Sequence, residues 1–226
     1  MKSLDVIKRD ILDKNFSEVE FPLLNFELVE AADSFLNFLA KTSNYIKNKI
    51  NSAIDPNERN IAEPTTEIGY MRKKKKAFND TNNDDKEVFH YHPYVEEVAK
   101  ERDCLTTEVS QFFEHARPVY DAAVHTTKKI IEVLETKYPE IRFHFFPQNM
   151  PERFHLRFLK YDPKKSGENL GRAHYDRGTI TLAIAESSPG LRIGRNPDSL
   201  KKVLEAAGFL NVKKYIKCIL LFILLI

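Results

Sequence analysis

The hydrophobic pattern of this chain changes its period once, close to Pro139. Before that residue, apolar side chains recur at three- and four-residue intervals from Thr107 to about Lys137, which predicts the longest helix of the protein. Because Pro118 lies inside this pattern, we expect a kink or a break near Arg117. After Pro139 the period shortens to two, as in strands. Helices followed by strands favour an α+β fold, in which helices support one face of a largely antiparallel sheet or barrel.

Three segments after Pro139 have the composition of strands. They are rich in aromatic and β-branched residues and are separated by turn residues, and they span Ile141–Phe146, Arg153–Tyr161 and Gly178–Ile184. In the second segment, one face would carry Phe154, Leu156 and Phe158, and the other would carry His155, Arg157 and Tyr161. A strand with one apolar and one polar face suits the wall of a barrel that encloses a ligand.

The N-terminal third predicts a helix from about Leu28 to Ile50, preceded by a short strand in the segment VEFPLLNF. Further on, His90 and His92 are two residues apart, so in a strand both would face one side, as a metal site could require. No cysteine or carboxylate stands at a matching offset. We therefore interpret these two histidines as surface or loop residues.

Charge and cysteine content exclude several classes of function. The 35 Lys and Arg residues nearly balance the 33 Asp and Glu residues, so the chain lacks the basic excess of a nucleic-acid-binding protein and a small-molecule or protein partner is expected. The basic run at 72–76, RKKKK, is interpreted as a solvated loop. Two cysteines, Cys104 and Cys218, indicate reduced thiols, and the N-terminus lacks a secretory signal, so a cytoplasmic protein is expected.

An apolar run, CILLFILLI, occupies Cys218–Ile226. These nine residues are too few to cross a bilayer as a helix, which takes about 20 residues. The run therefore predicts no membrane-spanning segment. It suits aggregation or contact with a membrane interface instead.

The residues with the clearest chemistry are His174 and Asp176. On an extended segment two side chains at this spacing point the same way, and an imidazole beside a carboxylate suits iron(II). The flanking segments RFLKYDP and GRAHYDRGTITLAIAESSPGLRI resemble the iron(II)- and 2-oxoglutarate-dependent oxygenases of the isopenicillin N synthase-like group, over roughly residues 19–194. The residues that match the family pattern are Arg157, Tyr161, Pro163, His174, Asp176, Thr181, Leu182, Gly190, Leu191 and Ile193.

This resemblance implies a double-stranded β-helix, or jelly-roll, core with an N-terminal helical support. It implies that His174 and Asp176 are iron(II) ligands and that Tyr161 hydrogen-bonds 2-oxoglutarate. The implied activity is oxidation or hydroxylation of a small organic substrate. Three regions are expected: residues 1–140 as the helical and strand support, 141–195 as the first part of the core, and 196–226 as a divergent apolar tail.

The family pattern also includes a distal histidine, which is the third protein ligand of iron, and an Arg-x-Ser motif that binds 2-oxoglutarate. The sequence has no histidine after His174 and no arginine after Arg195. The leading interpretation is therefore an oxygenase whose reading frame is lost near Arg195 and which is inactive or nearly so. Two alternatives stay open: His155 as a substitute iron ligand, and a non-catalytic scaffold or interaction protein derived from this fold.

Overall fold

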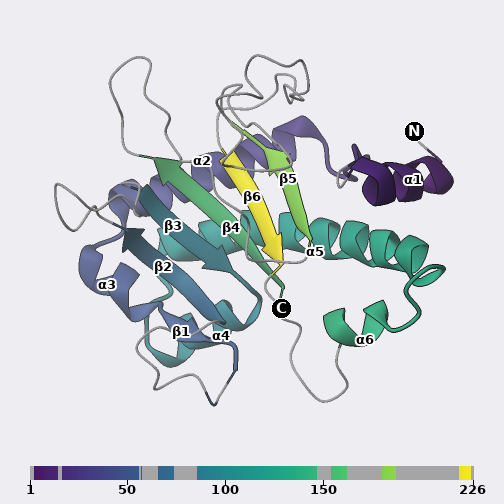
Figure 1. Ribbon diagram of the computed structural model, residues 1–226. Helices are drawn as coiled ribbons and strands as arrows, with labels where there is room; N and C mark the ends of the chain where they lie inside the picture. The colour runs from purple at the N-terminus through teal and green to yellow at the C-terminus, as the bar shows by residue number, and fades with distance from the viewer. Residues whose placement is uncertain are drawn as a thin grey trace, which may run out of the picture.

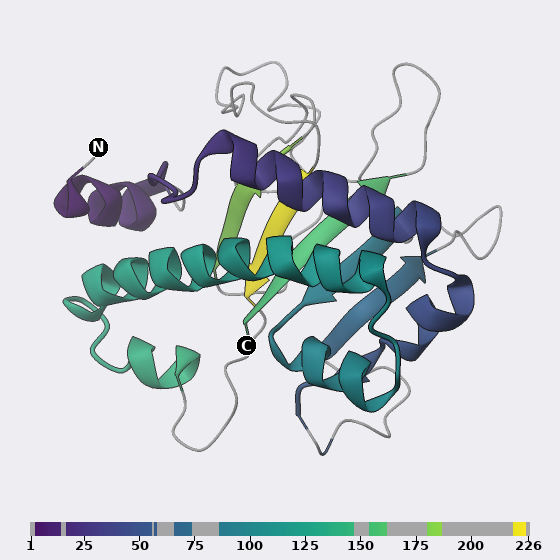
Figure 2. The same cartoon turned by 180° about the vertical axis from the view of Figure 1, so that it is seen from behind.

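In the described part of the chain, six strands form one sheet, and two long helices cover one of its faces (Figures 1 and 2). The computed structural model describes residues 3–14, 17–55, 57, 66–73, 86–146, 154–161, 180–186 and 219–224. The helices are α1 (Leu4–Lys14), α2 (Asn25–Lys41), α3 (Asn44–Lys49), α4 (Tyr94–Glu101), α5 (Thr107–Glu135) and α6 (Ile141–Phe145). The strands are β1 (Ser52–Ala53), β2 (Glu67–Lys73), β3 (Lys86–Tyr91), β4 (Phe154–Tyr161), β5 (Thr181–Ala185) and β6 (Ile219–Leu224). Their order is β1-β2-β3-β4-β6-β5 with every neighbouring pair antiparallel, which confirms the mixed helix and antiparallel-sheet architecture.

The core lies between the sheet and the pair α2 and α5, which run side by side across the face of the sheet that is turned toward the viewer in Figure 2. Its centre is Phe112 of α5, whose ring centroid lies 5.3 Å from that of Phe38 in α2. The same ring lies 4.9 Å from Phe89 of β3 and 5.0 Å from Phe158 of β4. All four side chains are fully buried. The helix predicted around residues 107–137 therefore supports the sheet, as expected.

Of the kink or break predicted near Arg117, the break is wrong, because α5 continues through Pro118 as one element. A proline has no N–H to donate to the carbonyl four residues earlier, here that of Glu114. Pro118 and Glu114 are both exposed, so water can reach that side of the helix. The hydroxyl of Thr106 caps the start of α5 by accepting the N–H of Val109 at 3.4 Å.

Two predictions for the N-terminal third are also corrected. The single helix expected over residues 28–50 is divided at Thr42, and α3 begins anew with Ser43 as its cap, whose hydroxyl accepts the N–H of Ile46 at 3.3 Å. The segment VEFPLLNF forms no strand; its last two residues, Asn25 and Phe26, begin α2.

The strand predicted over residues 141–146 is wrong, because this segment forms the short helix α6. Two contacts explain the difference. Arg142 pairs with Glu135 at the end of α5, with Nε 2.7 Å from Oε1. On the other side of the segment, Phe145 is buried and stacks on Phe154 of β4 at 6.4 Å. The aromatic residues that suggested a strand thus pack as a helical turn.

The apolar run near the C-terminus supplies a strand of the sheet. Residues Ile219–Leu224 form β6, which lies between β4 and β5 (Figure 1). In the register of the ladder, Ile223 pairs with His155 of β4 on one side and with Thr181 of β5 on the other. The sequence alone predicts a divergent apolar tail here and no strand.

Gly69 in β2 allows a close approach of two backbones. Its φ angle is +98°, in the left-handed region, and a Cβ atom there would lie 1.8 Å from the carbonyl oxygen of Ile50. Only glycine fits both conditions. This contact brings the chain from α3 into β1, where Ser52 pairs with Ile68.

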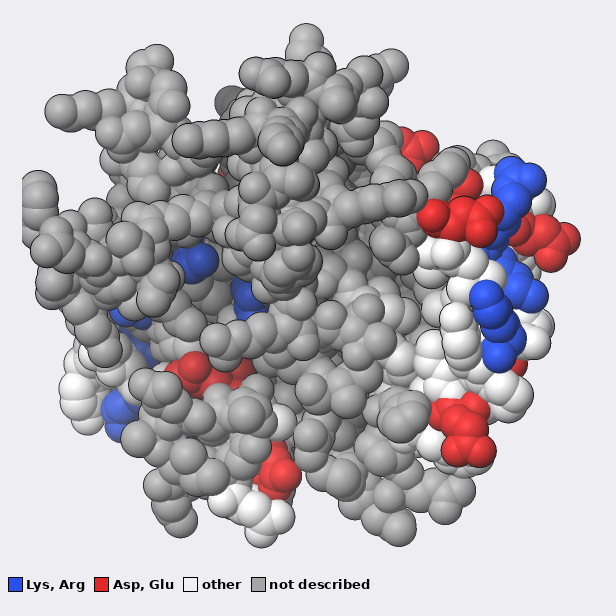
Figure 3. Space-filling model, viewed as in Figure 1, with Lys and Arg blue, Asp and Glu red and all other residues white. Residues whose placement is uncertain are grey.

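Within the parts of the chain that the structure describes, no helix is long and apolar enough to cross a membrane. On the face seen in Figure 3, the basic and acidic side chains that the structure describes are interspersed and gather into no patch of one sign.

Candidate functional site

The face of the sheet opposite the helices carries a cluster of polar side chains. We call this face the open face. His90 of β3 lies directly across the ladder from Arg157 of β4. The ring of His155 stacks on that of His90, with 4.4 Å between centroids and 20° between planes. The predicted alternation of β4 is confirmed, because Phe154, Leu156 and Phe158 all belong to the helix-facing core.

His155 is held in its neutral form. Its side chain is only 1% exposed, and burial lowers its pKa to about 3, with further contributions from Arg157 and His92. Nη2 of Arg157 lies 3.4 Å from Nε2 of His155. Since a guanidinium only donates hydrogen bonds, Nε2 is the acceptor and the proton of this imidazole is on Nδ1.

The orientation of His90 is fixed in the same way. Its Nδ1 lies 3.0 Å from the carbonyl oxygen of Glu67 on β2, and a carbonyl can only accept, so Nδ1 carries the proton. Three adjacent strands thus hold a stack of two imidazoles next to a guanidinium. A guanidinium is a charged donor of the kind that pairs with carboxylates and phosphates.

Tyr161 lies at the far end of β4. It packs against a small apolar cluster of Met71, Val88 and Leu159, and the ammonium of Lys86 lies 5.4 Å from its ring centroid. The ladder pairs Tyr161 with Lys86, six residues along β4 from His155.

The other two predicted site residues, His174 and Asp176, lie outside the described residues, in the sequence between β4 and β5. Among the residues that are described, no three His, Cys, Asp or Glu side chains are placed to hold a metal ion together. The structure thus positions Tyr161, and leaves the two proposed iron ligands as a sequence prediction.

The interpretation of His90 and His92 as surface or loop residues is wrong for His90, which lies in β3 and is only 6% exposed. His92 does lie in the connection between β3 and α4, but it is buried, with an exposed fraction of 9%. His92 follows β3, and its Nδ1 accepts the backbone N–H of Tyr94 at 3.1 Å. Its ring meets that of Tyr120 edge-on, at 5.7 Å and 80°. Pairing of β3 between β2 and β4 buries His90, and sequence periodicity alone does not reveal which strands become neighbours.

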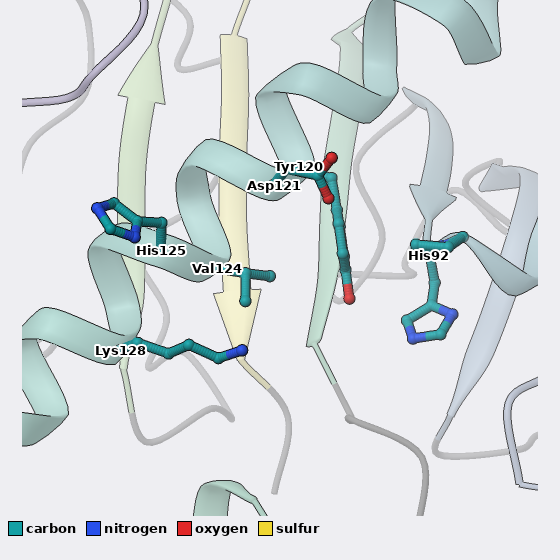
Figure 4. Close-up of a pocket in the computed structure, with 7 residues that line it drawn as sticks. His92, Tyr120, Asp121, Val124, His125 and Lys128 are labelled. Carbon is teal, nitrogen blue, oxygen red and sulfur yellow. The ribbon is translucent and has the colours of Figure 1, made fainter.

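A cavity of about 500 Å³ lies beside His92, where the end of β3 meets the flank of α5 (Figure 4). Its described lining consists of His92, Pro93, Tyr120, Asp121, Val124, His125 and Lys128. Sequence reasoning missed this site. The α5 residues do recur at helical spacing, which is a signal that they share one flank, but nothing in the sequence indicates that His92 faces them.

Comparison with known proteins gives a structural likeness. No protein-family model and no curated protein matches the sequence. Among solved structures, the chain resembles a protein from Caulobacter crescentus described as a candidate member of the 2OG-Fe(II) oxygenase family, with a TM-score of 0.53 and 20% sequence identity. The match covers 90% of this chain and 62% of that protein, so the chain spans less than two thirds of its neighbour. At this identity the likeness shows the fold alone, a helix-supported antiparallel sheet that this chain shares with that neighbour.

Proposed function

We propose that the chain is a 2-oxoglutarate- and iron(II)-dependent oxygenase of the isopenicillin N synthase-like group, built on a double-stranded β-helix and related to enzymes that oxidise small organic molecules. The observation that carries the proposal is the fold likeness to a candidate 2OG-Fe(II) oxygenase across 90% of the chain. The motif residues of β4 and β5 support it, because Arg157 and Thr181 belong to strands of one sheet that are separated only by β6.

In this proposal His174 and Asp176 are two protein ligands of iron(II), and Tyr161 hydrogen-bonds 2-oxoglutarate. When bound with 2-oxoglutarate and dioxygen, iron(II) supplies oxidative decarboxylation to succinate coupled to oxidation of a substrate. The described residues suit the cosubstrate better than the metal. Tyr161 and Arg157 lie on the same side of β4 and are donors for a carboxylate, whereas no described group of three side chains could hold a metal ion.

The 226-residue chain offers iron only part of the expected ligand set, since no histidine follows His174 and no arginine follows Arg195. A two-ligand site binds iron weakly compared with a facial triad, and a dicarboxylate without its arginine loses a charge-assisted bidentate contact. We therefore expect this polypeptide to bind iron(II) loosely and to turn over little or no 2-oxoglutarate.

The experiment is anaerobic loading with iron(II) and 2-oxoglutarate, followed by desalting, metal analysis and measurement of succinate after air is admitted. We expect substoichiometric iron and no succinate above the level of a His174→Ala variant. His115→Ala, which changes a partly exposed histidine of α5, is the matched control. Succinate formation that His174→Ala abolishes would show that the chain is active, and iron binding that neither His174→Ala nor Asp176→Ala weakens would refute the ligand assignment.

The alternative is a non-catalytic scaffold derived from the same fold. The observation behind it is that no histidine follows His174 within these 226 residues, so this polypeptide by itself does not carry a full facial triad. Metal analysis in the same experiment separates the two candidates, because a scaffold would retain no iron that depends on His174, whereas a weakened oxygenase site would show saturable binding that His174→Ala removes.

A further inference from the structure

A groove of about 810 Å³ lies between α4 and the flank of α5 that runs from Ser110 to Asp121. In Figure 2, α4 lies beside the beginning of α5. The volume of the groove falls within the range of roughly 300 to 1,000 Å³ that is typical of small-molecule sites. None of its described lining residues belongs to the set assigned to iron or 2-oxoglutarate.

The groove has an apolar floor. Phe113 of α5 is almost fully buried, and its ring centroid lies 5.9 Å from that of Tyr91 in β3, so its position is fixed by the core. Leu105, in the connection between α4 and α5, is 47% exposed, and Pro118 is also exposed. A hydrocarbon chain that lies along this flank would remove apolar surface of Leu105 and Pro118 from water, which is favourable.

Carboxylates outnumber cationic groups along this groove. Glu96 is neutralised by Arg117, whose Nε and Nη2 lie 3.1 and 2.9 Å from the two carboxylate oxygens. Among the described lining residues, three further carboxylates have no ion pair within the described part of the chain: those of Glu97, Glu114 and Asp121. Lys100 is the one other cation of the described lining. The groove is therefore complementary in charge to a cationic ligand.

The spacing of two of these carboxylates is set by the helix that carries them. Glu114 and Asp121 are seven residues apart in α5, which is close to two full turns, so they lie on one flank about 10 Å apart along the axis. Pro118 lies between them. Because Pro118 has no N–H, the backbone carbonyl of Glu114 lacks its usual helical donor and can accept a hydrogen bond from a ligand.

We propose that this groove binds a linear organic diamine. One ammonium group lies at Glu114, where the side chain and the backbone carbonyl both accept, and the other lies at Asp121. The methylene chain between them packs on Pro118 and the apolar floor. Since the guanidinium of Arg117 also lies between the two carboxylates along α5, a plain methylene spacer suits the groove better than a polyamine with an internal ammonium. This site is independent of the proposed oxygenase chemistry, and it needs no iron to be tested.

The test is ¹H–¹⁵N NMR titration of the α5 amides of the full chain, at low ionic strength, with three amines. Octamethylenediamine carries two charges on a long spacer, tetramethylenediamine carries two charges on a spacer too short to reach both carboxylates, and octylamine carries one charge. We expect saturable binding of octamethylenediamine. Each of the other two should bind more weakly by about two- to fivefold, which is the fold-change that one exposed ion pair provides.

Substitutions then identify the two anchoring carboxylates. Asp121→Asn and Glu114→Gln should each reduce the affinity for octamethylenediamine to that for octylamine, because only one ion pair is left. Glu101→Gln is the matched control, since this exposed carboxylate of α4 is not among the described lining residues. Glu114 and Asp121 are both exposed, so their substitution should not disturb folding, and circular dichroism of the variants checks this.

Three results would overturn the proposal: no saturable binding of octamethylenediamine, equal affinity for the three amines, or equal weakening by Asp121→Asn and Glu101→Gln. The second result would mean that the spacing of the two carboxylates contributes nothing. The third would mean that the amine is attracted by the acidic surface in general. The comparison of the three amines uses the unaltered chain, so it decides the proposal even if a variant were to lose its fold.

Discussion

The two faces of the sheet differ in what their side chains do. On the helix-facing side, Phe89 and Phe158 are fully buried against Phe112. On the open face, one residue away along the same strands, His90 and His155 stack beside a guanidinium. The alternation of β3 and β4 thus assigns successive residues to the scaffold and to the polar array. A register shift of a single residue would exchange the two sets, so the aromatic core also fixes the positions of the polar residues.

The largest expected effect comes from opening the aromatic core. Phe112→Ala should destabilise the protein by about 3 to 5 kcal/mol, because it leaves a cavity among Phe38, Phe89 and Phe158. The measurement is urea unfolding at neutral pH. The control is Phe143→Ala in α6, where the ring is 60% exposed and the expected change is within about 0.5 kcal/mol. A loss below about 1 kcal/mol for Phe112→Ala would contradict the packing described for this face.

The contribution of the open face to the free energy of unfolding should decrease at acidic pH. The pKa of His155 falls from 6.5 to about 3 on burial, so between these values the unfolded chain binds a proton that the folded chain does not. Stability from this group is therefore complete above pH 6.5 and is lost as the pH falls toward 3. Between pH 7 and pH 5 the loss should be about 2 kcal/mol.

His155→Gln removes the titrating ring, so its unfolding free energy should depend less steeply on pH over the same interval. The comparison is with His125→Gln, which changes an exposed histidine and should keep the wild-type slope. Equal slopes for wild type and His155→Gln would show that His155 is not held neutral in the folded state.

A smaller effect on stability is expected from Glu87, which is buried at the rim of the helix-facing side. Its carboxylate accepts hydrogen bonds from the hydroxyl of Tyr70 at 2.8 Å and from the ammonium of Lys160 at 3.0 Å, and it lies 3.2 Å from the guanidinium of Arg72. Burial opposes ionisation of Glu87, but these partners outweigh it and keep its pKa below the usual value. Glu87→Gln should cost about 1 to 2 kcal/mol of stability.

The same substitution gives a second readout at Tyr70. Burial and the bond to Glu87 raise the pKa of Tyr70 to about 12, and loss of the negative charge should lower it, as measured by ultraviolet titration of the phenolate. Glu135→Gln is the control: it also removes an ion pair, that with Arg142, but this pair lies at the surface and contributes little to stability. If the pKa of Tyr70 were unchanged by Glu87→Gln, the charge of Glu87 would not be what raises it.

Sequence periodicity identified the elements whose side chains keep one regular pattern over many residues. The long helix α5 and the alternating strand β4 are the two examples, and both have the predicted faces. The secondary structure of short aromatic segments is harder to predict from the sequence. The segment Ile141–Phe145 has the composition of a strand, but a pairing between Arg142 and Glu135 and the burial of Phe145 make it a helical turn. Side-chain contacts with the neighbouring elements, here α5 and β4, decide such cases.

The site residues show the same difference between what spacing along the sequence predicts and what the packing of elements decides. The spacing within β4 was enough to predict that His155, Arg157 and Tyr161 lie on one side. The burial of His90 and His92 depends on which strands become neighbours, and the cavity of Lys128 depends on where β3 ends against α5. The roles of His174 and Asp176 as iron ligands come from their resemblance to a family pattern and stay a prediction.

The place of β6 has a consequence for how the protein is made. Ile219 pairs with Leu159, and the two residues are separated by a long stretch of chain that includes β5. On a ribosome, β4 and β5 emerge well before the strand that joins them, so until then each exposes an unpaired edge. This part of the sheet can therefore fold only after β6 has been synthesised. We therefore expect refolding in the slow range of domains dominated by non-local pairing, with the nascent chain needing protection from aggregation until β6 is complete.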